Sequence, residues 1–262
     1  MTCEYVKLSK DALLNKYAVN EYTEIEKKKK IYDGIIKTIN GEKVGIFGLT
    51  TAETATISSP GAVEFEDYIE AAEKSVEAFE KQGVNKIIAL THIGYYYGGG
   101  DNDLLLAEHV AGIDVIVGGH SHSNLNEPTV VEKHDEPTII VQANEYTKYL
   151  GTLDVSFDKN GKVIAHDGKL IDINAQVDGK YVIAEDEETA RILNEKYKPE
   201  VEKMKTQVVA ETEVELIGGN PAARTKETNL GNLIADGMLA KAKSINSKTV
   251  IALQNGGGVR TT

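Results

Sequence analysis

Cysteine and long apolar runs are the most informative absences from this sequence of 262 residues. Cys3 is the only cysteine, which excludes an internal disulfide and a metal site built from several thiolates. No run of 18 or more apolar residues occurs, and the start of the chain lacks a basic region followed by an apolar one. We therefore expect neither a membrane-spanning helix nor a signal peptide within these residues.

Basic side chains are also scarce relative to acidic ones. The chain has 29 Lys and Arg against 41 Asp and Glu, which gives a formal net charge of -12. This balance argues against a nucleic-acid-binding surface. A hydrophobic content of 41% and a charged content of 27% are typical of globular proteins, and the length allows one large domain or two modest ones.

Two histidines follow a short apolar stretch in the middle of the chain. Val115 to Val117 is β-branched and predicts a buried strand, and Gly118 and Gly119 then allow a sharp turn. In an extended segment the side chains of His120 and His122 point the same way, so both can reach one site. Neutral imidazole is the commonest protein ligand for transition metals. An isolated His-x-His is equally consistent with a polar loop whose histidines only form hydrogen bonds.

A second apolar strand favours the metal interpretation. Residues 86–90 lead directly into His92, so two strands each deliver histidine at their carboxyl ends, where open α/β sheets place ligands. We expect His92, His120 and His122 to converge on one metal site. His109, His134 and His166 lie in other contexts and are interpreted as ordinary surface or packing residues.

Hydrophobic periodicity predicts an α/β fold with parallel strand pairing. Strands and helices alternate along the chain, and Asn40-Gly41 is a strong hairpin signal. The expected elements are a hairpin over 31–39 and 43–49, a helix over 65–79 ended by Gly83, a short helix from 104, a strand over 138–143, and a hairpin over 150–157 and 163–173.

The last third of the chain changes character. A charged helix is expected over 186–207, where Pro199 predicts a kink or a division into two pieces. Thr228 is a candidate N-cap for a following helix. Thr249 to Leu253 is apolar and predicts a strand.

Two pairs of motifs resemble a known family. Thr91-His92-Ile93-Gly94 and Gly118-Gly119-His120-Ser121-His122 resemble the later half of a calcineurin-like metallophosphoesterase domain. Residues 227–236 and Asn255-Gly256-Gly257-Gly258-Val259-Arg260 resemble the opening of the 5′-nucleotidase C-terminal domain. In this order they resemble the bacterial 5′-nucleotidase family over about residues 31–262.

The resemblance implies an architecture. It implies a layered α-β-β-α metallophosphoesterase sandwich, present in part, followed by the start of a second α/β domain. We therefore expect a metallophosphoesterase domain over 1–175, a helical linker over 176–207, and a substrate-binding domain beginning at 208 and running to 262.

The resemblance also implies a reaction and its residues. His92, His120 and His122 would be ligands of a centre with two divalent metal ions, such as Zn or Mn. Nucleotide substrate would contact residues of the second domain, namely Arg224, Asn255, Gly257 and Arg260. The expected reaction is hydrolysis of nucleotide phosphate esters, and the family also includes 2′,3′-cyclic-nucleotide phosphodiesterases and UDP-sugar hydrolases. The family implies a secreted or cell-surface enzyme.

Departures from the family pattern shape these expectations. The early Asp-x-His, the Gly-Asp-x-x-Asp and the Gly-Asn-His-Glu motifs are absent, and the stacking aromatics would follow Thr262. We therefore expect an internal fragment with no catalytic acid of its own and little turnover alone. A non-enzymatic metal- or nucleotide-binding module is the alternative.

Overall fold

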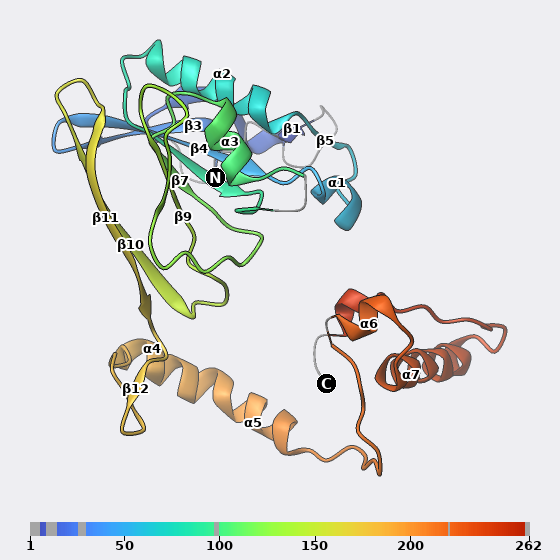
Figure 1. Ribbon diagram of the computed structural model, residues 1–262. Coiled ribbons are helices and arrows are strands. Elements are labelled where there is room, and N and C mark those ends of the chain that lie inside the picture. The colour runs from blue at the N-terminus through green and yellow to red at the C-terminus, as the bar shows by residue number, and fades with distance from the viewer. Residues whose placement is uncertain (1–5, 9–14, 26–29, 97–99, 220, 260–262) are drawn as a thin grey trace. The chain divides into compact units, whose positions relative to one another are not determined.

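The chain folds as two units, residues 1–184 and 185–262. The computed structural model describes residues 6–8, 15–25, 30–96, 100–219 and 221–259 (Figure 1). None of the helices within these ranges has the length and apolar character that a membrane crossing requires.

A seven-stranded mixed sheet forms the centre of the first unit, in the order β2-β3-β4-β6-β7-β9-β8. Strands β4, β6, β7 and β9 run parallel to one another, whereas β3 and β4 form the antiparallel hairpin that Asn40-Gly41 predicts. The α/β fold and its parallel pairing are confirmed. The strands are β2 (Ala18–Thr23), β3 (Ile31–Ile39), β4 (Glu42–Thr50), β6 (Ile87–His92), β7 (Val115–Val117), β8 (Thr129–Val131) and β9 (Thr138–Val141).

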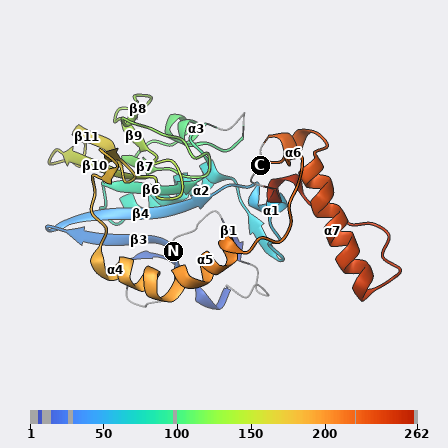
Figure 2. The same ribbon diagram turned by 90° about the horizontal axis from the view of Figure 1, so that it is seen from below.

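Two helices, α2 (Tyr68–Glu80) and α3 (Asp103–His109), cover one face of this sheet (Figures 1 and 2). The predicted periodicity of α2 is confirmed, and the Asp67 side chain caps it by accepting from two backbone amides of the first turn. Phe79 is fully buried directly above Gly34 and Gly45. A Cβ on Gly34 would lie 2.6 Å from the Phe79 ring, and one on Gly45 would lie 2.8 Å from it. The two glycines therefore bring the helix close to the sheet.

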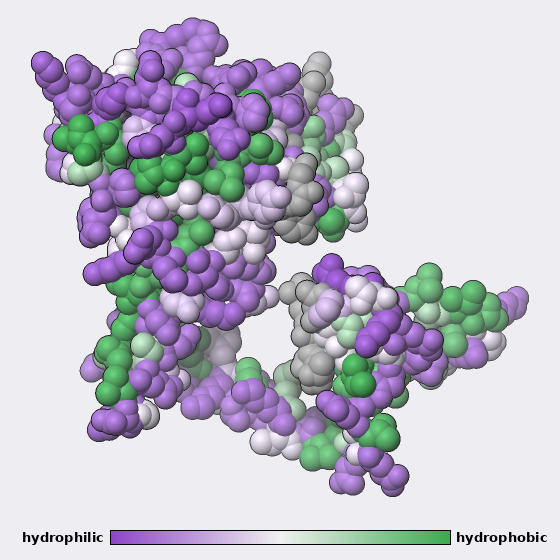
Figure 3. Space-filling view, in the orientation of Figure 1, coloured by the Kyte–Doolittle hydropathy of each residue, from purple (hydrophilic) through white to green (hydrophobic). Residues whose placement is uncertain are grey.

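The opposite face of the sheet is only partly covered. The hairpin of β10 (Tyr149–Phe157) and β11 (Val163–Asp172), which was also predicted, packs Val163 against Val115 and Ile139. Beyond the hairpin Leu90 stays 47% exposed and Val117 39% exposed. Figure 3 shows hydrophobic residues at the surface along the hairpin, where Leu150 is exposed. The remaining elements of the unit are β1 (Val6–Leu8), β5 (Val63–Phe65), β12 (Gln176–Val177), β13 (Lys180–Tyr181), α1 (Thr54–Ile57) and the 3₁₀ turn Asn15–Tyr17.

The described part of the second unit is helical. A helix divided by a π-helical turn (Leu193–Tyr197) consists of α4 (Glu187–Ile192) and α5 (Lys198–Thr206). Pro199 lies in the first turn of α5, where its missing N–H is tolerated, so the predicted division at this proline is confirmed. The other helices are α6 (Ala222–Thr225), α7 (Asn229–Ile245) and a 3₁₀ turn (Gly256–Gly258).

The strand predicted over Thr249 to Leu253 is wrong. These residues form no regular element, and Val250 and Leu253 are 75% and 85% exposed. A strand is stabilised by backbone hydrogen bonds to a neighbour, and within residues 185–219 and 221–259 no segment pairs with this one. Apolar, β-branched composition alone does not supply that partner.

Candidate metal centre

His92 and His120 lie side by side at the carboxyl edge of the sheet. His92 is the last residue of β6, and β7 pairs with β6 in parallel before the chain turns through Gly118 and Gly119 to His120. The two imidazole centroids are 5.1 Å apart and the ring planes cross at 62°. Adjacent parallel strands therefore bring together two histidines that are 28 positions apart in the chain.

The histidine turn, residues 118–123, is not the extended segment that we expected. His120 has a φ of 73° and His122 a φ of 54°, both in the left-handed region that L-residues seldom adopt. The predicted i, i+2 alternation is therefore wrong, because it applies only to extended backbone. His122 instead turns toward the segment after β9, with its ring 6.1 Å from that of Tyr146.

The glycines of the turn are required by close packing. A Cβ on Gly119 would lie 3.0 Å from Nδ1 of His92, so glycine lets the His92 ring rest on the backbone of the turn. A Cβ on Gly118 would collide with Oδ2 of Asp103, which is fully buried. The other carboxylate oxygen of Asp103 accepts a hydrogen bond from the Thr91 hydroxyl at 2.6 Å.

Two carboxylates approach the histidine turn, and sequence reasoning did not single out either of them. Oε2 of Glu53, just before α1, lies 3.5 Å from Nε2 of His120. Oε2 of Glu145 lies 2.7 Å from Nδ1 of His122, and Oε1 of the same side chain lies 2.8 Å from Nζ of Lys148. The motifs give no signal for these acids, because both stand in loops of unremarkable composition.

Electrostatics favour neutral imidazole at this edge. Burial lowers the pKa of His92 below its usual value, and the neighbouring His120 and His122 lower it further. A neutral imidazole keeps a lone pair available for a metal ion, whereas a protonated one does not. Burial also raises the pKa of Asp103 to about 7, against the opposing hydrogen bond from Thr91.

The donor atoms at this site are of the kinds that bind transition metals, but fewer of them gather than a complete ligand set requires. Imidazole nitrogen with carboxylate oxygen suits Zn or Mn. Among the residues that the structure describes, however, no group of three or more His, Cys, Asp or Glu side chains gathers around one point. His92 and His120 form the paired core of the candidate site, while His122 faces Glu145. The three-histidine ligand set stays a prediction.

Three of the four residues expected to contact substrate gather in the second unit. Arg224 lies in α6, and its Nη2 would be 2.7 Å from a Cβ on Gly257. Nδ2 of Asn255 would be 3.5 Å from that same Cβ. The guanidinium and the side-chain amide therefore meet over the backbone of the glycine turn, while Arg260 lies outside the described residues. Their role in binding stays a prediction.

Comparison with known proteins identifies the class of this chain. Residues 208–262 match the family model described as the 5′-nucleotidase C-terminal domain. The chain is 46% identical over 247 residues to the trifunctional nucleotide phosphoesterase protein YfkN of Bacillus subtilis, covering 91% of this chain and 16% of that protein. It is 37% identical to the 5′-nucleotidase of Diplobatis ommata, over 85% of this chain and 40% of the relative.

Solved structures agree with this assignment. The crystal structure of the 5′-nucleotidase precursor from Thermus thermophilus matches with a TM-score of 0.69 and 35% identity, over 93% of this chain and 46% of that one. The chain therefore has the fold of the calcineurin-like phosphoesterases and 5′-nucleotidases. Its residues 208–262 match the 5′-nucleotidase C-terminal domain, and most of its length is similar to proteins named 5′-nucleotidase or nucleotide phosphoesterase. It spans less than half the length of these relatives.

Proposed function

We propose that the protein containing this chain hydrolyses phosphate esters of nucleotides with the help of divalent metal ions. The observation that carries the proposal is the pair of imidazoles, His92 and His120, at the carboxyl edge of a parallel sheet. It is supported by the relatives, which are named nucleotide phosphoesterase and 5′-nucleotidase.

His92 and His120 would hold metal in this proposal, with His122 as a third ligand. A bound pair of Zn or Mn ions lowers the pKa of a coordinated water and polarises the phosphoryl group. The chain's own contribution is to present neutral imidazoles on a closely packed turn. Among the described residues no three His, Cys, Asp or Glu side chains gather at one point, so the proposal requires ligands in addition to these histidines.

Nucleotide would be held by the second unit. The Arg224 guanidinium offers paired donors for phosphate oxygens, and the glycine turn beside it exposes backbone to an approaching anion. Arg260 would add a second guanidinium. This proposal assigns the metal ligands to the first unit and the substrate contacts to the second.

Secretion or cell-surface attachment is the proposed location. A relative that is 36% identical over 86% of this chain is a snake venom 5′-nucleotidase from Gloydius brevicauda. A single cysteine in the sequence is compatible with a location inside or outside the cell.

The test is hydrolysis by the protein expressed from its whole reading frame, measured as inorganic phosphate from AMP and as nucleoside monophosphate from 2′,3′-cyclic AMP and UDP-glucose. AMP, 2′,3′-cyclic AMP and UDP-glucose are compared with Mn²⁺ or Zn²⁺ present and after chelation. We expect metal-dependent turnover that falls by two orders of magnitude or more in His92→Ala and His120→Ala, because each removes a proposed ligand. His166→Ala, an exposed histidine on β11, is the matched control. Equal activity in all three variants would overturn the proposal.

A further inference from the structure

The segment that follows β9 holds the histidine turn from two sides. Gln142, which is 2% exposed, reaches the backbone of the turn. Its Nε2 donates to the carbonyl oxygen of Gly119, and its Oε1 accepts from the amide of Ser123 at 2.6 Å and from the hydroxyl of Ser121 at 3.0 Å. These contacts bracket both His120 and His122.

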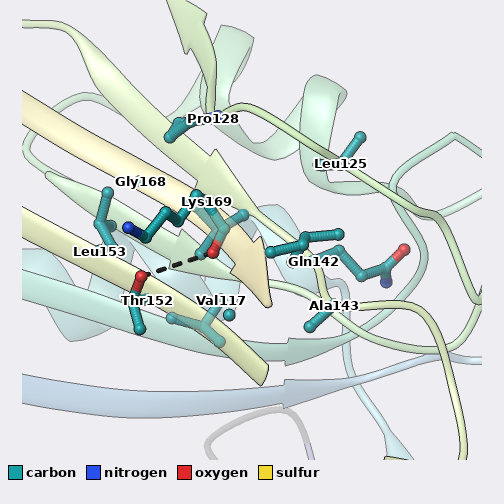
Figure 4. Close-up of a pocket in the computed structure, with 12 residues that line it drawn as sticks. Val117, Leu125, Pro128, Gln142, Ala143, Thr152, Leu153, Gly168 and Lys169 are labelled. Carbon is teal, nitrogen blue, oxygen red and sulfur yellow. Dashed lines mark hydrogen bonds between the residues drawn. The ribbon is translucent and has the colours of Figure 1, made fainter. Parts of the chain in front are cut away.

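A primary amide is the side chain that this position requires. It supplies a donor and an acceptor without charge, and the turn presents one carbonyl and two donors. Val117 and Ala143 line an apolar pocket beside it, and in Figure 4 the amide of Gln142 points away from Thr152, Leu153 and Lys169 on the far side of that pocket. The polar end of Gln142 is thus directed at the turn, and its stem contributes to the pocket wall.

Glu145 acts on the imidazole of His122. With Nδ1–H directed at Oε2 of Glu145 over 2.7 Å, the ring atom that remains for a metal is Nε2. Lys148 contacts the other oxygen of the same carboxylate, which orients the carboxylate in turn. Asn144, Tyr146 and Thr147 all have positive φ values, between 51° and 60°. Strained backbone of this kind is retained where surrounding contacts hold it.

We propose that Gln142 and Glu145 are positioning residues for the histidine turn. Gln142 fixes the left-handed backbone at His120 and His122, and Glu145 fixes the ring orientation of His122 so that Nε2 faces a metal. The assignment of a metal to these rings rests on the proposed function, whereas the positioning itself is a property of the metal-free chain. Neither residue touches substrate or the reacting atoms in this proposal.

The variants separate the two contributions. Gln142→Glu keeps the shape but removes the donor to Gly119, and Gln142→Asn keeps the chemistry but shortens the reach. Glu145→Gln keeps an acceptor for His122 and removes the charge. Gln176→Glu on β12 and Glu108→Gln on α3 are exposed and serve as matched controls.

The first readout is NMR of the metal-free chain labelled with ¹⁵N-histidine, which reports the tautomer and environment of each ring. We expect Gln142→Glu to shift or split the signals of His120 and His122 while His109 and His166 stay unchanged. We expect Glu145→Gln to convert His122 from one tautomer to a mixture, with His92 unmoved. Unchanged His120 and His122 signals in a folded variant would overturn the inference, as would equal changes at all six histidines.

The second readout is calorimetric titration with Mn²⁺ or Zn²⁺ alone. We expect Gln142→Glu and Glu145→Gln to weaken binding by about 10- to 100-fold, the range found for residues that orient metal ligands. Gln142→Asn should recover part of that loss, and the controls should bind as the parent chain does. The titrations use the protein expressed from its whole reading frame. If that parent protein binds neither ion, the metal assignment fails, and the NMR result still decides whether Gln142 and Glu145 position the turn.

Discussion

Asp114 should make the stability of the first unit fall as pH rises from 4 to 7. Its side chain is 4% exposed at the amino end of β7, and Oδ2 accepts from the amide of Ile87 at 2.7 Å. Burial raises the pKa of Asp114 from 3.8 to about 7, and the nearby Glu136 contributes in the same direction. The amide of Ile87 and the ammonium of Lys86 oppose the shift without cancelling it.

The size of the effect follows from proton linkage. Between pH 4 and 7 the folded chain keeps Asp114 protonated whereas the unfolded chain has released that proton, so unfolding releases a proton. Stability therefore falls by about 1.4 kcal/mol for each pH unit in this window. The whole window amounts to about 4 kcal/mol as an upper bound. Asp114→Asn removes the titration and keeps an oxygen that accepts from Ile87.

Hydrogen exchange of peptides from β6 and β7 is the suitable assay, because two units that unfold separately would mix in one denaturation curve. At each pH the variant is compared with the parent chain, which cancels the pH dependence of intrinsic exchange. We expect Asp114→Asn to gain protection over the parent as pH rises, and Asp154→Asn on the exposed side of β10 to gain none. A difference that stays constant from pH 4.5 to 7.5 would refute the assignment of a protonated Asp114.

Two further perturbations test the packing that supports each unit. Gly118→Ala should lower the free energy of unfolding by about 1–3 kcal/mol, because the new Cβ collides with the buried carboxylate of Asp103. Hydrogen-exchange rates in β7 measure this loss. Gly151→Ala is the control and should cost far less, since the nearest atom to its Cβ is 3.4 Å away. A cost equal to that of Gly151→Ala would show that the turn relaxes freely. Thr228→Ala should destabilise α7 by about 1 kcal/mol, since the hydroxyl accepts from the amide of Gly231 at 3.2 Å. Faster exchange confined to the first turns of α7 is the expected signature, and unchanged exchange there would contradict the capping role.

Patterns within short stretches of the sequence predicted several of the helices and strands. Asn40-Gly41 indicated the first hairpin, the spacing of apolar residues indicated α2, and Pro199 indicated the division between α4 and α5. The strand that ends at His92 and the one before His120 were recognised because both are short apolar runs followed by turns. In each case the pattern that indicates the element lies within a short stretch of sequence, although the strands pair with segments farther along the chain.

The candidate site was less predictable because its geometry depends on contacts between distant segments. Glu53 and His120 are 67 positions apart, and no motif near either residue indicates that the two side chains approach each other. The left-handed backbone at His120 contradicts the local preference of an L-residue, so a local rule predicts the wrong conformation. Gln142 was classed with a strand end, although its side chain organises the whole turn. Tertiary contacts overrode local preference at these positions.

The open face of the sheet and the candidate metal site lie next to each other along β6. Side chains alternate along β6, so His92 lies on the same face as Ile88 and Leu90, opposite the face that α2 and α3 cover. Leu90 is 47% exposed there, and burying an apolar side chain of this size is worth about 1.5–3 kcal/mol. Any segment that covers Leu90 must also approach His92, two residues further along the same face. Hydrophobic burial of Leu90 and access to the imidazole of His92 are therefore coupled on this face of the sheet.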